Sequence, residues 1–201
     1  MKKSIKWIIA LVVCVAVFIG VYFLYNALKE EYEPERFATQ TKTSQQSDNS
    51  DKQTENKTAQ TESNYSTASD FTVLDEKGNK VKLSDYFGKP IVLNFWASWC
   101  YYCKEEMPDF NEAYKKHSDI QFLMVNATDG ASETIDSAKN YVDSQGFDFP
   151  IYFDTYFEAS NAYQVTGLPM TVFIDKNGKL ITYTSGMLTA SELEKGINLI
   201  K

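Results

Sequence analysis

A short apolar run followed closely by two cysteines restricts the possible folds more than any other feature of the chain. Residues 91–96 read Ile-Val-Leu-Asn-Phe-Trp, and the segment Trp99-Cys100-Tyr101-Tyr102-Cys103-Lys104 comes soon after. An apolar run of this length is typical of a strand that is buried on both faces of a sheet. Between Cys100 and His117, apolar residues recur at helical spacing: Met107, Phe110 and Tyr114. The pattern therefore predicts a central strand that leads, through a short loop, into a helix carrying both cysteines.

The remainder of residues 70–201 alternates between strand and helix patterns. Strands are predicted at 71–74, 81–83, 120–125, 151–153, 171–174 and 180–185. Helices are predicted at 132–145, 156–163 and 190–200. The segment Thr189-Ala190-Ser191-Glu192 has the pattern of a capping box at the start of the last helix. Alternating strands and helices with a hairpin at each end predict an α/β fold with a mixed sheet.

The N-terminal segment has the composition of a membrane anchor. The run from Trp7 to Leu28 contains 22 residues without a charge, roughly 33 Å of helix, which matches the thickness of a bilayer core. Lysines precede the run, so we expect the N-terminus in the cytoplasm and the rest of the chain outside. Residues 1–28 are thus predicted to form a cytoplasmic N-terminus and a single transmembrane helix.

Two cleaved alternatives fit the N-terminal segment less well. A secretory signal peptide has a shorter apolar core, of about 7–15 residues, and ends in a small-residue cleavage site that this chain lacks. A lipoprotein signal would use Cys14, but Val13 stands where such signals have a small residue. A retained signal-anchor is therefore the favoured interpretation.

Residues 29–69 are predicted to be a disordered polar linker. From Thr39 onward they are almost all Thr, Ser, Gln, Asn, Lys, Asp and Glu, so this tract has too little apolar surface to fold. The net charge of the chain is −7, and the acidic excess falls in the predicted domain, residues 70–201. An acidic domain would repel phosphate, so the composition argues against a nucleic-acid partner.

The cysteine pair is suited to redox chemistry. The N-terminus of a helix favours a thiolate, so the pKa of Cys100 should be lowered. A Cys100 thiolate would attack a partner disulfide, and Cys103, one turn further on, would resolve the mixed disulfide. A structural disulfide is the weaker alternative, because it would join distant segments. A metal site is also weaker, because three cysteines and one histidine cannot supply four zinc ligands.

The stretch KPIVLNFWASWCYYCKEEMP resembles the active-site segment of the thioredoxin superfamily. It is most similar to the membrane-anchored, extracytoplasmic TlpA/ResA-like branch. The resemblance covers about residues 70–201 and includes an N-terminal hairpin, an insertion between Thr128 and Phe149, and the stretch TGLPMTVFIDKNGKL. It implies a thioredoxin fold, with a mixed central sheet flanked by helices, and a protein thiol-disulfide oxidoreductase that needs no cofactor and no metal.

The resemblance also assigns roles to individual residues. Cys100 is expected to be the nucleophile and Cys103 the resolving thiol. Pro169 matches the cis-proline of the family, which would place the backbone of Leu168 beside the sulfurs to pair with a substrate strand. Trp99 is expected to shape the substrate site.

Proton handling is expected to differ from that of cytoplasmic thioredoxins. Those proteins have a buried Asp where this chain has Asn94, which cannot accept a proton in that role. The TlpA/ResA-like branch resembles this chain in having a Glu three residues after the second cysteine, which is Glu106. We therefore predict that Glu106 accepts the proton of Cys103. The alternative is that Glu106 is a solvated acid on the helix face, next to Glu105.

The resemblance points to a reductase of exported proteins, such as apocytochrome c. Strong oxidants of the superfamily have a His beside the second cysteine, and this chain has Tyr102 there. The electron donor implied is a multi-span membrane thiol carrier of the CcdA/DsbD type. Two alternatives remain in the same fold: a disulfide-forming oxidase, and a copper-delivery protein similar to the Sco group. The latter group has three residues between its cysteines and a distal His ligand, whereas this chain has two residues and only His117.

Overall fold

The computed structural model describes residues 18–19, 22–23 and 66–201. Most of the predicted transmembrane helix and most of the predicted linker lie outside these residues, so both stay predictions. Within the described part of the chain, no helix combines the length and the apolar character needed to cross a bilayer. Residues 66–69, predicted as linker, already contact the domain: Thr67 pairs with Lys179, and Ala68 is buried. The folded domain therefore includes Ser66 rather than beginning at Asp70.

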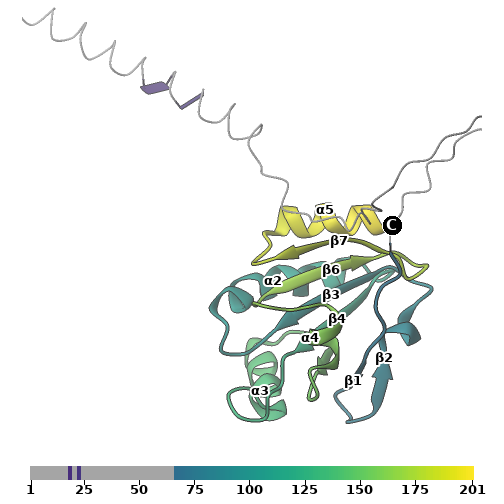
Figure 1. Cartoon of the computed structure of the whole chain (residues 1–201). Helices are drawn as coiled ribbons and strands as arrows, with labels where there is room; N and C mark the ends of the chain where they lie inside the picture. Colours follow the sequence, from purple (N-terminus) through teal and green to yellow (C-terminus); the bar gives the residue numbers. More distant parts are fainter. Residues whose placement is uncertain (1–17, 20–21, 24–65) are drawn as a thin grey trace, which may run out of the picture. The chain divides into compact units, whose positions relative to one another are not determined.

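The described domain is built on one mixed sheet of seven strands, with the order β2-β1-β5-β4-β3-β6-β7 (Figure 1). Strands β3, β4 and β5 are parallel, and the other neighbouring pairs are antiparallel. The strands are β1 Thr72–Leu74, β2 Lys80–Lys82, β3 Ile91–Trp96, β4 Gln121–Asn126, β5 Ile151–Phe153, β6 Met170–Ile174 and β7 Leu180–Ser185. The prediction of an α/β fold with a mixed sheet and an N-terminal hairpin is confirmed.

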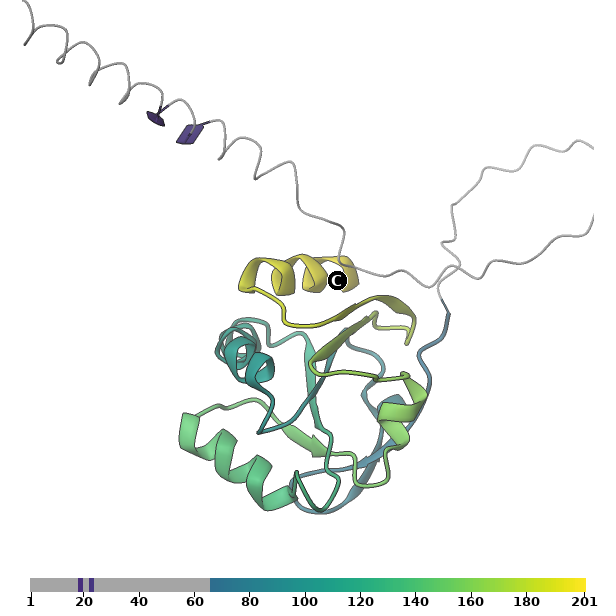
Figure 2. The same cartoon turned by 60° about the vertical axis from the view of Figure 1, so that its left-hand side comes forward.

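Helices cover both faces of the sheet. They are the 3-10 helix η1 Leu83–Tyr86 and the α-helices α2 Tyr101–Lys116, α3 Ile135–Gln145, α4 Glu158–Ala162 and α5 Ala190–Ile200. Figure 2 shows α2 and α3 on one side of the sheet and α4 on the other. Helices α2, α3 and α5 share one core cluster, and α4 packs into a second. Helix α3 lies within the predicted insertion between Thr128 and Phe149.

Strand β3 is central because both of its faces are covered. All six of its residues are buried, between β4 on one side and β6 on the other. Side chains alternate along a strand: Val92 and Trp96 enter the core cluster beneath α2, while Leu93 and Phe95 enter the opposite one. The same alternation turns Asn94 toward the α2 face. The carboxyl end of β3 thus carries the loop to α2 out of the most buried part of the domain.

Several helix ends differ from the prediction. Helix α3 begins at Ile135 instead of Ser132, because the side chain of Thr134 caps it by accepting a hydrogen bond from the Ser137 N–H. Helix α4 is shorter than residues 156–163, since Phe157 before it has a left-handed backbone with φ of 55°. The predicted end of α3 at Gln145 and the capping box of Thr189 and Glu192 are confirmed.

Candidate active site

Cys100 and Cys103 form a disulfide at the N-terminus of α2. The prediction that the helix carries both cysteines is wrong at one position. Cys100 is the N-cap of α2, and the helix begins at Tyr101. Its Sγ accepts a hydrogen bond from the Cys103 N–H at 3.2 Å. Cys100 is 6% exposed and Cys103 is fully buried. Cys100 is therefore the sulfur that a partner disulfide reaches first.

The surroundings of Cys100 favour a thiolate once the disulfide is reduced. The first N–H groups of a helix lack intrahelical partners and carry partial positive charge. One of them already points at the sulfur of Cys100, and the first turn of α2 contains no acidic side chain. A negative sulfur at the N-cap is thus stabilised, and a thiolate is the nucleophilic form of cysteine.

The Leu168–Pro169 peptide bond is cis, as predicted. It directly precedes β6, whose first residue, Met170, pairs with Phe95 near the end of β3. The side chain of Leu168 packs against the core cluster that contains both cysteines. The cis-proline turn and the cysteine pair therefore lie at the same end of neighbouring strands. The pairing of Leu168 with a substrate strand stays a prediction.

Glu106 is a buried carboxyl group, with 1% of its surface exposed. Its Oε1 accepts a hydrogen bond from Asn94 Nδ2 at 2.9 Å, and its Oε2 accepts one from the Leu188 N–H at 2.8 Å. The alternative of a solvated acid is therefore wrong. The spacing offered a signal, because Glu106 is three residues from Cys103 and four from Phe110, on the buried face of α2.

Burial raises the pKa of Glu106 to about 7, although the hydrogen bonds from Leu188 and Asn94 act in the opposite direction. A carboxyl group in this range exchanges its proton near neutral pH, which general acid–base chemistry requires. The transfer of a proton from Cys103 to Glu106 stays a prediction that this placement supports.

Asn94 connects three elements of the site. Its Nδ2 also donates to Thr171 Oγ1 at 3.0 Å, so it bridges Glu106 on α2 and Thr171 on β6. Its Oδ1 is buried without a hydrogen-bond partner among the described residues. Asn94 thus holds the carboxyl group of Glu106 in place. The sequence indicated only that Asn94 stands where cytoplasmic thioredoxins have a buried Asp, and it did not indicate this contact.

Three aromatic side chains next to the cysteines are open to solvent. Trp99, Tyr101 and Tyr102 are 59%, 64% and 60% exposed. The rings of Tyr101 and Tyr102 meet edge to face, with centroids 5.4 Å apart. Exposed aromatics next to a reactive group are typical of surfaces that bind another protein. The assignment of Trp99 to substrate binding stays a prediction.

Glu133 is a site residue that the sequence analysis missed. It was assigned to a helix, but it lies in the loop before α3, is fully buried, and binds Ser98 in the loop between β3 and α2. The two residues are 35 positions apart in the chain, and no local pattern joins them.

His117 does not approach the cysteines. It caps the C-terminal end of α2, and the 16 residues of that helix span roughly 24 Å. Its Nε2 lies 3.1 Å from both carboxylate oxygens of Glu194. In the described residues no three His, Cys, Asp or Glu side chains are grouped to hold a metal ion. The histidine thus offers no distal ligand for the copper-delivery alternative.

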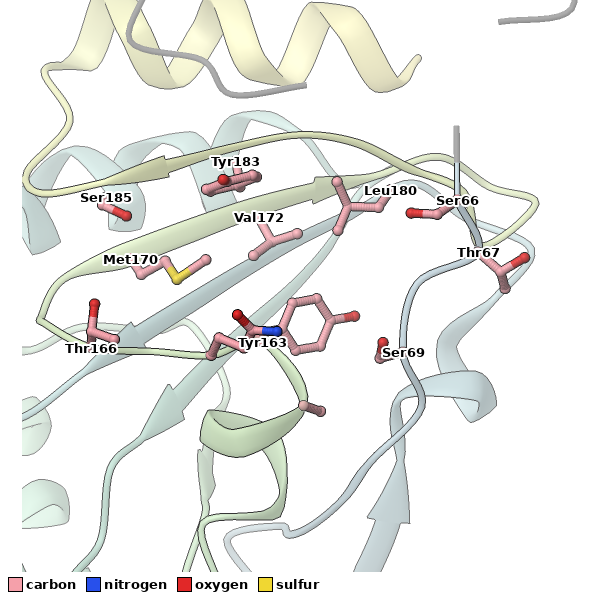
Figure 3. A pocket seen from close by; sticks show the side chains of 12 residues that line it. Ser66, Thr67, Ser69, Tyr163, Thr166, Met170, Val172, Leu180, Tyr183 and Ser185 are labelled. Atoms are coloured by element: carbon pink, nitrogen blue, oxygen red, sulfur yellow. The ribbon is translucent and has the colours of Figure 1, made fainter. Parts of the chain in front are cut away.

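A cavity of about 350 Å³ is lined by residues of β6 and β7 and of neighbouring loops (Figure 3). Its lining includes Met170 and Val172 of β6, which belong to the core cluster on the face opposite the cysteines. The hydroxyl of Tyr163 is buried beside it without a partner among the described residues, and burial raises the pKa of that phenol. The lining of the cavity includes no cysteine and no charged side chain.

The pKa of Glu106 predicts a measurable pH dependence of stability. The folded pKa, about 7, is above the ordinary value of 4.5, so between these values the folded state binds more protons than the unfolded state. The stability that protonated Glu106 contributes to the folded state is fully present below pH 4.5 and is lost as the pH rises through about 7. We expect the free energy of unfolding of the oxidised wild type, relative to Glu106→Gln, to fall by about 3 kcal/mol between pH 4.5 and 8.

Urea unfolding of both proteins across this pH range measures the difference. Glu112→Gln is the matched control, because Glu112 is exposed on the same helix. Parallel stability curves for wild type and Glu106→Gln would contradict the raised pKa.

Comparison with known proteins agrees with the geometry of the site. The model of the AhpC/TSA family matches residues 65–183. The chain is 40% identical to the thiol-disulfide oxidoreductase ResA of Geobacillus kaustophilus over 138 residues, which are 68% of this chain and 77% of the relative. The ResA of Bacillus subtilis is 36% identical over 138 residues, covering 68% of this chain and 75% of the relative.

The chain is also similar to a solved structure of a thioredoxin. The exposed lipoprotein thioredoxin of Streptococcus pneumoniae is 31% identical, with a TM-score of 0.55, and the alignment covers 64% of this chain and 98% of that one. The fold, the cysteine pair at the start of α2 and these similarities agree. The chain therefore belongs to the AhpC/TSA family of thioredoxin-fold proteins and, within it, to the ResA-type thiol-disulfide oxidoreductases.

Proposed function

We propose that this oxidoreductase reduces disulfide bonds in exported proteins at the outer side of the cytoplasmic membrane. The observation that carries the proposal is the position of the Cys100–Cys103 pair. Cys100 caps α2 and receives an N–H hydrogen bond, while Cys103 is fully buried behind it. This arrangement supports an attacking thiolate and a shielded resolving thiol.

The reaction consists of two thiol–disulfide exchanges. The Cys100 thiolate attacks one sulfur of the substrate disulfide, which forms a mixed disulfide and releases the other substrate sulfur as a thiolate. The Cys103 thiolate then attacks Cys100 Sγ, which breaks the mixed disulfide and releases the second substrate thiolate. The substrate gains two electrons, and the enzyme becomes the Cys100–Cys103 disulfide, the form in the structure.

Glu106 supplies the proton chemistry of the second step. Cys103 is buried and must lose its proton before it attacks. Glu106 is three residues further along the same buried helix face, with a pKa raised to about 7 by burial. A deprotonated Glu106 accepts the proton of Cys103, which raises the fraction of thiolate at neutral pH.

The electron direction is supported by the residues between the cysteines. A His beside the second cysteine stabilises the reduced state and makes a pair strongly oxidising, and here Tyr101 and Tyr102 occupy both positions. The chain contains one cysteine besides the pair, Cys14, so it cannot relay electrons through the membrane alone. We propose a multi-span thiol carrier of the CcdA/DsbD type as donor and cysteine pairs of exported proteins, such as apocytochrome c, as substrates.

The location rests on the N-terminal sequence. Residues 7–28 carry no charge and follow three lysines, which favours one membrane span with a cytoplasmic N-terminus. The polar composition of residues 29–69 is suited to a tether, and a loose coil of this length has an end-to-end distance of roughly 35 Å.

Substitution of each cysteine separates their roles. Cys100→Ser should abolish reduction of insulin by the reduced enzyme, because the nucleophile is lost. Cys103→Ser should instead accumulate mixed disulfides, because the resolving thiol is lost. Insulin turbidity and non-reducing gel electrophoresis measure these outcomes, with Cys14→Ser as the matched control. Insulin reduction by Cys100→Ser at the wild-type rate would refute the assignment.

The reduction potential of the Cys100–Cys103 pair tests the electron direction. We expect a value well below the roughly −120 mV of a strong disulfide-forming oxidant. Equilibration of the protein with glutathione and dithiothreitol buffers, followed by mass spectrometry of alkylated thiols, gives the potential. A value near that of the oxidants would favour the disulfide-forming alternative.

Cell fractionation tests the membrane anchor. The full-length chain should sediment with membranes and resist extraction by high salt, because its attachment is apolar. A chain that begins at Ser66 should be released to the soluble fraction with its insulin reductase activity intact, because the described domain contains the whole cysteine site. Recovery of the full-length chain in the soluble fraction would contradict the anchor.

A further inference from the structure

Glu133 joins the active-site loop to the loop before α3 through hydrogen bonds of its side chain. It is fully buried in the loop between β4 and α3. Its Oε1 accepts hydrogen bonds from the Ser98 N–H at 3.1 Å and from Asn126 Nδ2 at 2.7 Å. Its Oε2 accepts one from the Ser98 hydroxyl at 2.7 Å. The carboxylate therefore binds both the backbone and the side chain of Ser98.

The position of Glu133 is itself fixed by its own loop. Asp129 Oδ1 accepts hydrogen bonds from the Glu133 N–H at 2.8 Å and from the Ala131 N–H at 2.7 Å. The Glu133 carbonyl accepts one from the Gly130 N–H at 2.9 Å. On the other side, Asn126 at the end of β4 is held by Thr128, whose Oγ1 donates to Asn126 Oδ1 at 2.7 Å. Ser98 is thus anchored to a loop with little freedom.

We propose that Glu133 is a positioning residue for the nucleophile. Ser98 precedes Cys100 by two residues, and the Cys100 N–H donates to the carbonyl of Ala97 at 3.1 Å. In the oxidised enzyme the disulfide also fixes Cys100. After reduction that bond is gone, and the hydrogen bonds from Ser98 to Glu133 keep Cys100 at the N-cap of α2. There its thiolate continues to receive the Cys103 N–H.

A second effect of Glu133 acts with the opposite sign. A negative charge close to Cys100 disfavours a thiolate, so loss of that charge alone would lower the pKa of Cys100. Loss of the positioning contact moves the sulfur away from the helix N–H groups and raises the pKa. The direction of the change therefore distinguishes positioning from a simple charge effect.

The experiment measures the Cys100 pKa from the pH dependence of iodoacetamide alkylation of the reduced full-length protein in detergent. Glu133→Ala should raise this pKa by about half a pH unit or more and slow alkylation at pH 6 by roughly threefold or more. Glu133→Gln keeps the volume and one acceptor for the Ser98 N–H but removes the charge, so its Cys100 pKa should be at or below that of wild type. Ser98→Ala removes only the hydroxyl contact, and it should shift the pKa in the same direction by less.

The double variant Ser98→Ala/Glu133→Ala tests the route of the effect. If Glu133 acts through Ser98, the double variant should have the same Cys100 pKa as Glu133→Ala alone, because the two changes remove one contact. Glu112→Gln, an exposed acid on α2, is the control for loss of a negative charge and should match wild type.

Three results would overturn the proposal. One is a lower Cys100 pKa in both Glu133 variants, which shows a charge effect. Another is an unchanged pKa in Glu133→Ala with a lower melting temperature, which shows a purely structural role. If Glu133→Ala does not fold, an unchanged pKa in Ser98→Ala is decisive in the same way. The role of Cys100 as the nucleophile rests on the proposed function, but the alkylation measurement does not, so failure of wild-type insulin reduction leaves this test intact.

Discussion

The burial of β3 on both faces is the constraint on which the rest of the domain depends. Because β3 pairs with β4 and β6 and all of its side chains are covered, its carboxyl end has a fixed position. The short loop that follows can then place Cys100 only at the start of α2, where the helix supplies an N–H group to the sulfur. The chemistry of the pair is in this sense a consequence of strand packing, and the cis-proline turn before β6 reaches the same end of the sheet for the same reason.

Two buried carboxyl groups, Glu106 on α2 and Glu133 in the loop before α3, differ in their hydrogen bonds. Glu106, along α2, accepts two hydrogen bonds, and burial outweighs them, so its pKa rises to about 7. Glu133, beneath the loop, accepts three, of which two come from Ser98. The first arrangement is suited to proton exchange, and the second to holding a loop.

Membership of the ResA-type oxidoreductases explains the reaction class, while the electron direction depends on the energies of the two redox states. Those energies are set by the groups around the sulfurs: the N–H of Cys103, the absence of an acid in the first turn of α2, and the two tyrosines between the cysteines. The tyrosines are exposed and contact each other. They are thus placed where a docking protein would meet them first.

The sequence by itself determined the features that depend on neighbouring residues. The buried strand 91–96, the helix after Cys100, the left-handed end of α3 at Gly146 and the capping box at Thr189 all have short-range patterns. The cis peptide at Pro169 followed from the family resemblance. The tertiary structure decided the contacts between distant segments. Glu106 receives a hydrogen bond from a residue 82 positions away, and Glu133 binds a serine 35 positions away. Local periodicity encodes which face of an element is buried, but the partner at that face depends on the path of the whole chain.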